Sequence, residues 1–177
     1  MSLIGYIYKL FNYYIKQNIP EIKSVDLYFD QFNTDNTGNT DSTSNPKILI
    51  EIQPIDFDRM FNGIQNAEVF VTLHIGIDIF NSFKTSELTD KNIQYLNLLS
   101  NIYKQLEGIS SFNLPNELKT TEYILHNINR SALTFATNSG SVKISTITFS
   151  LIAEDNSLCY SLYEDSILEI NNTINIT

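Results

Sequence analysis

The residue types best suited to catalysis or metal binding are two histidines and one cysteine, in a chain of 177 residues. His74 and His126 lie far apart, and neither belongs to an HxH or HxxxH pair. Because metal-binding histidines commonly recur at such short spacings, we expect structural or solvated roles for both. Cys159 has no histidine or basic neighbour in the sequence to activate its thiol. We therefore expect no catalytic residue, no metal site and no cofactor.

Residues 31–46 are almost wholly polar and contain a partial calcium-loop pattern. Ser44 stands where such a loop needs a bidentate glutamate, and helical sequence is missing on both sides. A segment of this composition cannot bury enough apolar surface to offset its ordering entropy, so a mobile loop is expected instead. The residues that match the calcium pattern are Asn33, Asp35, Thr37 and Gly38.

Two pairs of carboxylates are the remaining candidates for acid–base chemistry. Asp26 with Asp30, and Glu154 with Asp155, lie on expected strands, where such acids are usually solvated. The sequence contains no GxSxG, GxxxxGK[ST] or GxGxxG motif, and only six glycines in all. We therefore expect a protein that is not an enzyme.

The clearest structural pattern is the run Ala67–Phe80, in which every odd position through Ile79 is apolar. A period of two predicts a β-strand with one buried face. The strand would be about 45 Å long, well beyond the usual length. Its even positions include Phe70, Thr72 and His74, which we expect on a face that either meets a neighbouring subunit or lies near the open side of the sheet.

Two segments show helical spacing of apolar residues, residues 3–18 and residues 89–107. Thr89 is suited to be the N-cap of the second helix, and Gly108 its C′ glycine. Each helix has one apolar stripe, so each is expected to lie on one face of a sheet. The stripes are Ile4, Ile7, Tyr8, Phe11, Tyr14 and Ile15 in the first helix, and Ile93, Leu96, Leu99, Ile102, Tyr103 and Leu106 in the second.

Further strands are predicted before and after the second helix. In the last of them, Val142 and Ile144 are apolar at even positions, whereas Ile147 and Phe149 are apolar at odd ones. A β-bulge near Ser145–Thr146 would restore a single buried face. The further strands are Val25–Asp30, Lys47–Gln53, Tyr123–Leu125, Leu133–Thr137 and Val142–Ala153, the last two joined by a turn at Asn138–Ser141.

The C-terminal segment, residues 158–177, has a different pattern from the rest of the chain. Its apolar residues Leu168, Ile170, Ile174 and Ile176 share one parity, and acidic residues precede them. Three interpretations stay open: a final edge strand of the same sheet, an arm that adds to a neighbour's sheet edge, or a loosely ordered tail. We expect these four residues to contact a partner or another subunit.

These elements predict a single α+β domain, residues 1–157, with the C-terminal segment as an arm or edge strand. The fold would be a mostly antiparallel twisted sheet, with two main helices packed on one face and a long β-hairpin arm. The net charge is −9, and the eleven Lys and Arg residues are spread thinly, which argues against tight binding to nucleic acid. No apolar run is long enough to span a bilayer, and no signal peptide is expected.

The order of these elements over about residues 3–153 resembles that of the tail-terminator and tail-completion proteins of tailed bacteriophages. The related head–tail joining ring proteins share the same order. The likeness rests on a short N-terminal helix, a strand at Val25–Asp30, a polar loop, a strand at Lys47–Gln53, the long strand Ala67–Phe80, the helix Thr89–Leu106 and a closing hairpin.

The resemblance implies a virion structural protein at the phage neck or tail end, assembled in the host cytoplasm. Its subunits would form a six- or twelve-fold ring around the DNA channel and contact other neck or tail proteins. Because the subunits carry a net negative charge, DNA would pass through the channel without specific binding. The alternatives are a binding or adaptor module that forms no ring, such as a baseplate or secretion-apparatus component, and an enzyme without a recognisable motif.

Overall fold

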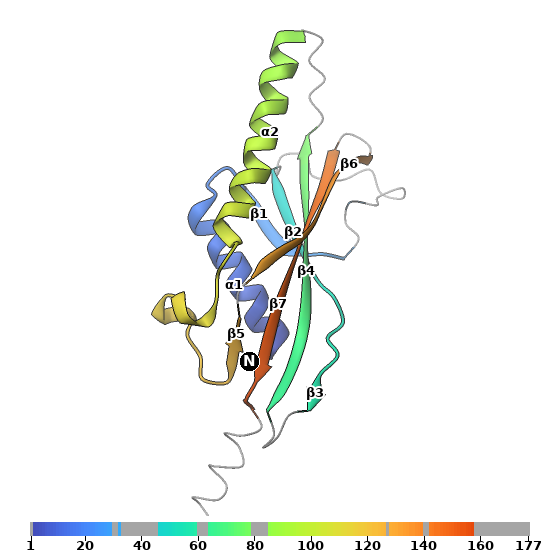
Figure 1. Ribbon diagram of the computed structural model, residues 1–177. Coiled ribbons are helices and arrows are strands. Elements are labelled where there is room, and N and C mark those ends of the chain that lie inside the picture. The colour runs from blue at the N-terminus through green and yellow to red at the C-terminus, as the bar shows by residue number, and fades with distance from the viewer. Residues whose placement is uncertain are drawn as a thin grey trace, which may run out of the picture.

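Two helices lie on one face of a curled, mixed β-sheet in the computed structural model of the chain (Figure 1). The expected α+β class is confirmed. The structure describes residues 2–29, 32, 46–59, 64–78, 85–126, 128–139 and 142–157. The proposed mobile loop lies almost wholly outside these residues, and the C-terminal segment lies entirely outside them.

The sheet has seven strands, in the order β1-β2-β4-β7-β5, with β3 paired to β4 and β6 paired to β7. All described pairings are antiparallel except β1 with β2, which is parallel. The strands are β1 (Ser24–Leu27), β2 (Lys47–Ile52), β3 (Asp58–Arg59), β4 (Gln65–Asp78), β5 (Tyr123–Leu125), β6 (Asn129–Ser139) and β7 (Val142–Asp155).

The long strand predicted at Ala67–Phe80 is β4, which occupies the centre of the sheet. It pairs with β7 along its whole length, from Gln65 opposite Asp155 to Asp78 opposite Val142. Its unusual length is therefore matched by an equally long partner. The expected alternation is confirmed, because the odd-numbered side chains face the helices in the main core. These are Ala67, Val69, Val71, Leu73, Ile75 and Ile77.

Helix α1 (Leu3–Asn18) has the predicted bounds and begins with a side-chain cap. The Ser2 hydroxyl accepts a hydrogen bond from the Gly5 N–H at 3.1 Å. Ile4, assigned to the buried stripe from the sequence, is half-exposed, because the stripe is centred on Leu3, Tyr6 and Leu10. Tyr6 belongs to that stripe because its hydroxyl donates to the Leu118 carbonyl at 2.9 Å.

Helix α2 (Thr85–Leu106) begins earlier than predicted, so Thr89 lies inside the helix and is not its N-cap. The predicted C-terminal end is confirmed: Gly108 has a φ of +76°, the left-handed conformation that suits a C′ glycine. The C-terminal half of the helix packs into the core, whereas its N-terminal half projects past the end of the sheet (Figure 1). Consequently Ile93 and Leu96, expected in the buried stripe, are half-exposed.

The predicted β-bulge near Ser145–Thr146 is absent from the pairing of β7 with β4, whose register is continuous. Ser145 instead occupies a core-facing position in an unbroken strand, where its hydroxyl hydrogen-bonds to that of Tyr95. A buried polar group is tolerated when it is hydrogen-bonded in this way. Val142 and Ile144 contribute to a separate small cluster on the other face, which explains their different parity.

Register shifts occur in β6, between Arg130 and Ala132 and between Thr134 and Thr137. The predicted hairpin is confirmed, since Ser139 pairs with Val142 where β6 leads into β7. Two one-residue shifts give an edge strand additional twist. No helix among the described residues has the length and apolar character needed to cross a membrane.

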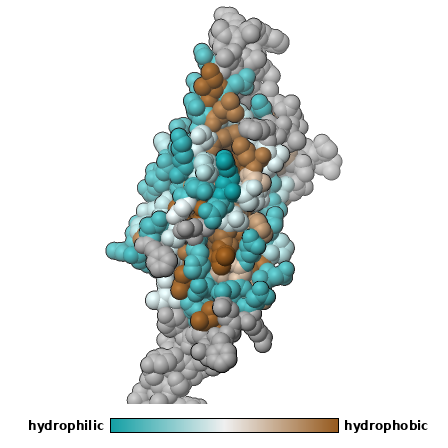
Figure 2. Space-filling view, in the orientation of Figure 1, coloured by the Kyte–Doolittle hydropathy of each residue, from teal (hydrophilic) through white to brown (hydrophobic). Residues whose placement is uncertain are grey.

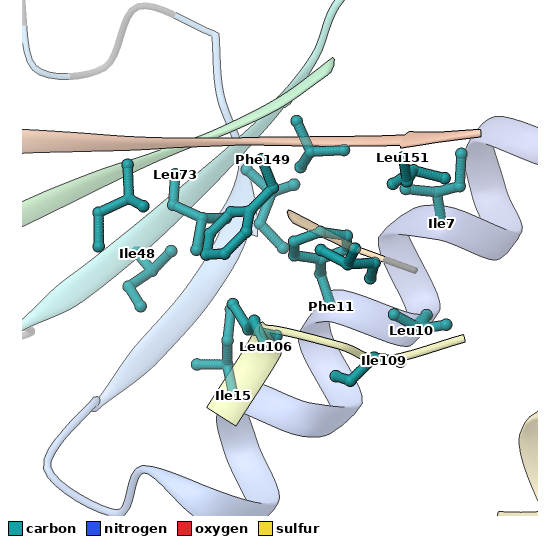
Figure 3. Packing of buried hydrophobic residues seen from close by; sticks show 14 of the residues in the cluster. Ile7, Leu10, Phe11, Ile15, Ile48, Leu73, Leu106, Ile109, Phe149 and Leu151 are labelled. Atoms are coloured by element: carbon teal, nitrogen blue, oxygen red, sulfur yellow. The ribbon is translucent and has the colours of Figure 1, made fainter. Parts of the chain in front are cut away.

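The main core lies between the two helices and the sheet (Figure 3). The rings of Phe11 and Phe149 meet edge to face at its centre, with 5.9 Å between centroids. Ile7, Leu10 and Ile15 of α1 surround this contact together with Ile48, Leu73 and Leu151 of the sheet and Leu106 of α2 (Figure 3). Aliphatic and aromatic side chains from both layers thus hold the helices on the sheet.

Two tyrosines buried in this core predict a dependence of stability on alkaline pH. Burial raises the pKa of Tyr6 and of Tyr95 above the ordinary value, since it disfavours the phenolate. The folded state therefore binds these protons more tightly than the unfolded state, and the stabilisation is complete below about pH 10.

We expect the free energy of unfolding, measured by urea titration at pH 7 to 11, to fall as the pH rises above about 10. Tyr95→Phe should make this fall shallower, although loss of the bond to Ser145 lowers stability at pH 7. A free energy of unfolding that stays constant from pH 9 to 11 would contradict the expected effect of the buried tyrosines.

Candidate functional site

The face of the sheet opposite the helices, termed the outer face, carries the residues predicted to meet a neighbour. Phe70 is half-buried, and the Thr72 hydroxyl shares a hydrogen bond of 3.0 Å with that of Thr148. Thr72 is only 8% exposed, and the side chain of His74 is 15% exposed. The parity assignment is therefore right, while the predicted contact with another subunit stays a prediction. Leu168, Ile170, Ile174 and Ile176 lie outside the described residues.

His74 contacts one residue of β2 and one residue that directly follows β1. Its Nε2 lies 2.7 Å from Oε2 of Glu51 on β2. Its ring stacks on that of Tyr28, with centroids 3.9 Å apart and planes 4° from parallel. Because one ring nitrogen and one ring face are already in use, His74 fixes the β1–β2–β4 side of the sheet rather than offering a free base.

His126 forms a second histidine–glutamate pair, with Glu154 near the C-terminal end of β7. Its Nε2 lies 2.6 Å from Oε1 of Glu154, and its backbone N–H donates to the Ile152 carbonyl at 2.8 Å. His74 lies opposite Thr146, six positions along β7 from Ile152, so about 20 Å of strand separates the two pairs. Within the described part of the chain, no three His, Cys, Asp or Glu residues are grouped so as to hold a metal ion.

The carboxylates considered as acid–base pairs have local structural roles where the structure describes them. Asp26 accepts the N–H of Leu27 at 2.8 Å, and Asp155 accepts that of Ser157 at 2.9 Å. Glu154 is paired with His126. Asp30, the residues of the calcium-like pattern and Cys159 lie outside the described residues. The two histidine–glutamate pairs were missed from the sequence because they depend on strand register, which the sequence pattern does not contain.

A small apolar cluster covers one end of the outer face. The ring of Phe32 packs over Gly76 and beside Leu49 and Val142, and the ammonium group of Lys47 lies 5.1 Å from the ring centroid. A methyl group at position 76 would come within 2.5 Å of the Phe32 ring, so glycine is required for this packing. The cluster attaches residue 32 to the sheet.

Gly76→Ala should therefore lower the free energy of unfolding by about 1–3 kcal/mol, the usual cost of overpacking. In a Phe32→Ala background the same substitution should cost much less, because the clashing ring is gone. Urea titrations of the four proteins in this double-mutant cycle measure the coupling. Equal costs of Gly76→Ala in both backgrounds would show that the Phe32 ring does not lie on Gly76.

Several hollows occur along the described surface. One of about 460 Å³ lies beside the middle of α2, and one of about 490 Å³ lies near Tyr6 and Ser111. The first has the size of a small-molecule site. Its described lining has one acid, Glu21, one ammonium, Lys91, and the Tyr95 hydroxyl, which is hydrogen-bonded to Ser145; the other lining residues carry amides or are apolar. The third hollow, of about 130 Å³, lies between α2 and β6.

No known protein-family model and no curated protein sequence matches this chain. The function must therefore be argued from the surfaces and contacts described above.

Proposed function

We propose that this protein is a structural subunit that acts by assembling with copies of itself into a ring. The proposed class is that of tail terminators and head–tail connectors, at the neck or tail end of a tailed-phage virion. The observation that carries the proposal is the one-sided construction of the domain: both helices cover the same face of the sheet (Figure 1). No described helix covers the outer face, and we expect this face and the terminal strands of the sheet to contact other subunits.

The terminal strand β6 supports an assembly role. It is eleven residues long, and the described side chains from Asn129 to Ala132 are exposed, although the Arg130 N–H on this edge donates to Glu107 Oε2 at 2.9 Å. Monomeric proteins usually keep such edges short or covered, because an exposed edge pairs readily with another chain. A long exposed edge is the expected feature of a subunit that joins neighbours through its sheet.

The charge and the contacts of the ionisable groups fit the same role. A net charge of −9 suits a surface past which DNA slides, since like charges repel. The described histidines are each paired with a glutamate on the sheet surface, which favours a structural role over acid–base catalysis. DNA would thus pass through the ring without specific binding.

Negative-stain imaging of the purified protein tests the proposal. We expect closed particles with six- or twelve-fold rotational symmetry and a central channel. Discrete one-to-one complexes with a partner, and no symmetric particles, would instead favour the alternative, a binding or adaptor module.

A further inference from the structure

A narrow apolar groove lies between α2 and β6, and we call it the α2–β6 groove. At about 130 Å³ it is smaller than the usual small-molecule site, and its size suits a single aliphatic side chain. Ser100 and Arg130 are the polar residues at its margin, and the Arg130 guanidinium lies 4.1 Å from the centroid of the Tyr103 ring. The apolar lining consists of Leu96, Leu99, Tyr103, Leu133 and Ile147.

Exposed apolar residues extend this groove along the projecting half of α2. Ile93 is 50% exposed and Leu96 is 49% exposed, and they lie one helical turn apart. Figure 2 shows hydrophobic surface along this half of the helix. Most of the apolar residues on α2 nearer its C-terminus are buried in the core, so this half has apolar surface that its own sheet leaves uncovered.

The adjacent strand β6 pairs only with β7 among the described strands. At the start of its second edge the Arg130 N–H donates to Glu107 Oε2 at 2.9 Å, so an added strand would have to pair with the part of β6 beyond Arg130. A strand added to this edge would extend the sheet sideways beyond β6, next to the α2–β6 groove. Alternate side chains of that strand would face the helix, next to Leu96 and Ile93. The added strand should therefore have apolar residues at every second position.

The C-terminal segment has most of this pattern, interrupted at Asn172, and a suitable length. Leu168, Ile170, Ile174 and Ile176 share one parity, and the nine residues from 168 to 176 would span about 30 Å as a strand. The eleven residues of β6 span about 36 Å. The two lengths therefore match.

Charge also favours this occupant. Residues 158–177 contain Glu164, Asp165 and Glu169 and no Lys or Arg. The sequence of β6 contains Arg130 and no acid. An acidic strand would therefore meet a single cation at the groove, the Arg130 guanidinium, with the Glu107 carboxylate nearby as acceptor of the Arg130 backbone N–H at 2.9 Å.

We propose that residues 158–177 of one copy add as a strand to β6 of a second copy and place an apolar side chain in the α2–β6 groove. This inference rests on the proposed function, because it supplies the contact between neighbouring subunits. It names the donor segment and the acceptor surface of that contact.

The position of the last strand favours a neighbour over the same chain. β7 ends at Asp155, beside β5, at the end of the sheet opposite the projecting half of α2 (Figure 1). To reach β6 of its own subunit, the segment would have to turn back past β5. By a direct path it would then lie parallel to β6. On a neighbour it can pair antiparallel, the slightly more stable arrangement.

Two full-length variants separate donor from acceptor. Ile93→Glu with Leu96→Glu blocks the acceptor surface, and both positions are half-exposed on a helix that accommodates glutamate. Ile170→Asp with Ile174→Asp blocks the donor. Each variant should weaken self-association by about a hundredfold or more, as expected when two central apolar contacts are lost. Ile4→Glu is the matched control, since Ile4 is an equally exposed isoleucine on α1.

Native mass spectrometry of the variants, alone and mixed, is the measurement. Each blocked variant alone should be a monomer, the control should assemble like the wild type, and the equimolar mixture should form one-to-one heterodimers. The heterodimer is expected because one variant keeps its donor segment and the other keeps its acceptor groove.

Other results overturn the inference or separate it from the proposed function. A mixture that remains monomeric, as it would if the segment occupied the groove of its own chain, overturns the exchange between copies. If the variants still form rings, the proposed contact site is wrong, whereas the proposed ring is unaffected. Heterodimers from the mixture, with open filaments from the wild type, support the exchange and overturn the ring.

Discussion

Replacing Leu73 with aspartate is expected to unfold the domain. Leu73 is fully buried at the centre of β4, where it faces α1 and the ring of Phe149 (Figure 3). An unpaired carboxylate there costs several kcal/mol, and the leucine packing is lost as well. Since a domain of this size is stable by only about 5–15 kcal/mol, little folded protein should remain. Far-UV circular dichroism and urea titration measure the loss.

Ile4→Asp is the control for this change. Ile4 is half-exposed in the first turn of α1, where a carboxylate interacts favourably with the helix dipole. Its stability should remain close to that of the wild type. If Leu73→Asp unfolded at the same urea concentration as the wild type, the odd-numbered side chains of β4 would not face the core.

Phe149→Ala is expected to have the second largest effect, a loss of about 3–5 kcal/mol in the free energy of unfolding. Phe149 on β7 contacts Phe11 of α1 edge to face, so its removal leaves a cavity between the helix and the sheet. Urea titration monitored by circular dichroism gives the change in midpoint, and the slope should stay the same.

Phe57→Ala makes the matched comparison, since Phe57 is 38% exposed and lies outside the main core. Its truncation should cost no more than about 1 kcal/mol, as is usual away from a packed core. Similar costs at the two positions would mean that the Phe11–Phe149 contact does not hold the two layers together.

The sequence pattern predicted the elements that depend on local periodicity. The alternation in β4, the bounds of α1 and the glycine that ends α2 follow from spacing and backbone preference within a few residues. The fold class follows from their order. Ile93 and Leu96 were misplaced because a helical stripe does not reveal where the sheet beneath it ends.

The remaining features depend on long-range register. The apolar parity of Val142 and Ile144 differs because they contact Leu49 and Phe32, which are distant in sequence. Ser145 is tolerated in the core only because Tyr95 of another element hydrogen-bonds to it. The α2–β6 groove likewise lies between a helix and a strand that are distant in sequence, so the sequence alone could suggest the proposed donor segment but not the proposed acceptor.

The mass of the protein in solution distinguishes the proposed closed ring from a monomer and from an open assembly. Multi-angle light scattering of the purified chain should give a single particle of six or twelve times the subunit mass of 20.3 kDa. The particle mass should not change on dilution across the range in which the ring remains closed. A mass of 20.3 kDa at every concentration, or a mass that rises without limit, would contradict the proposal.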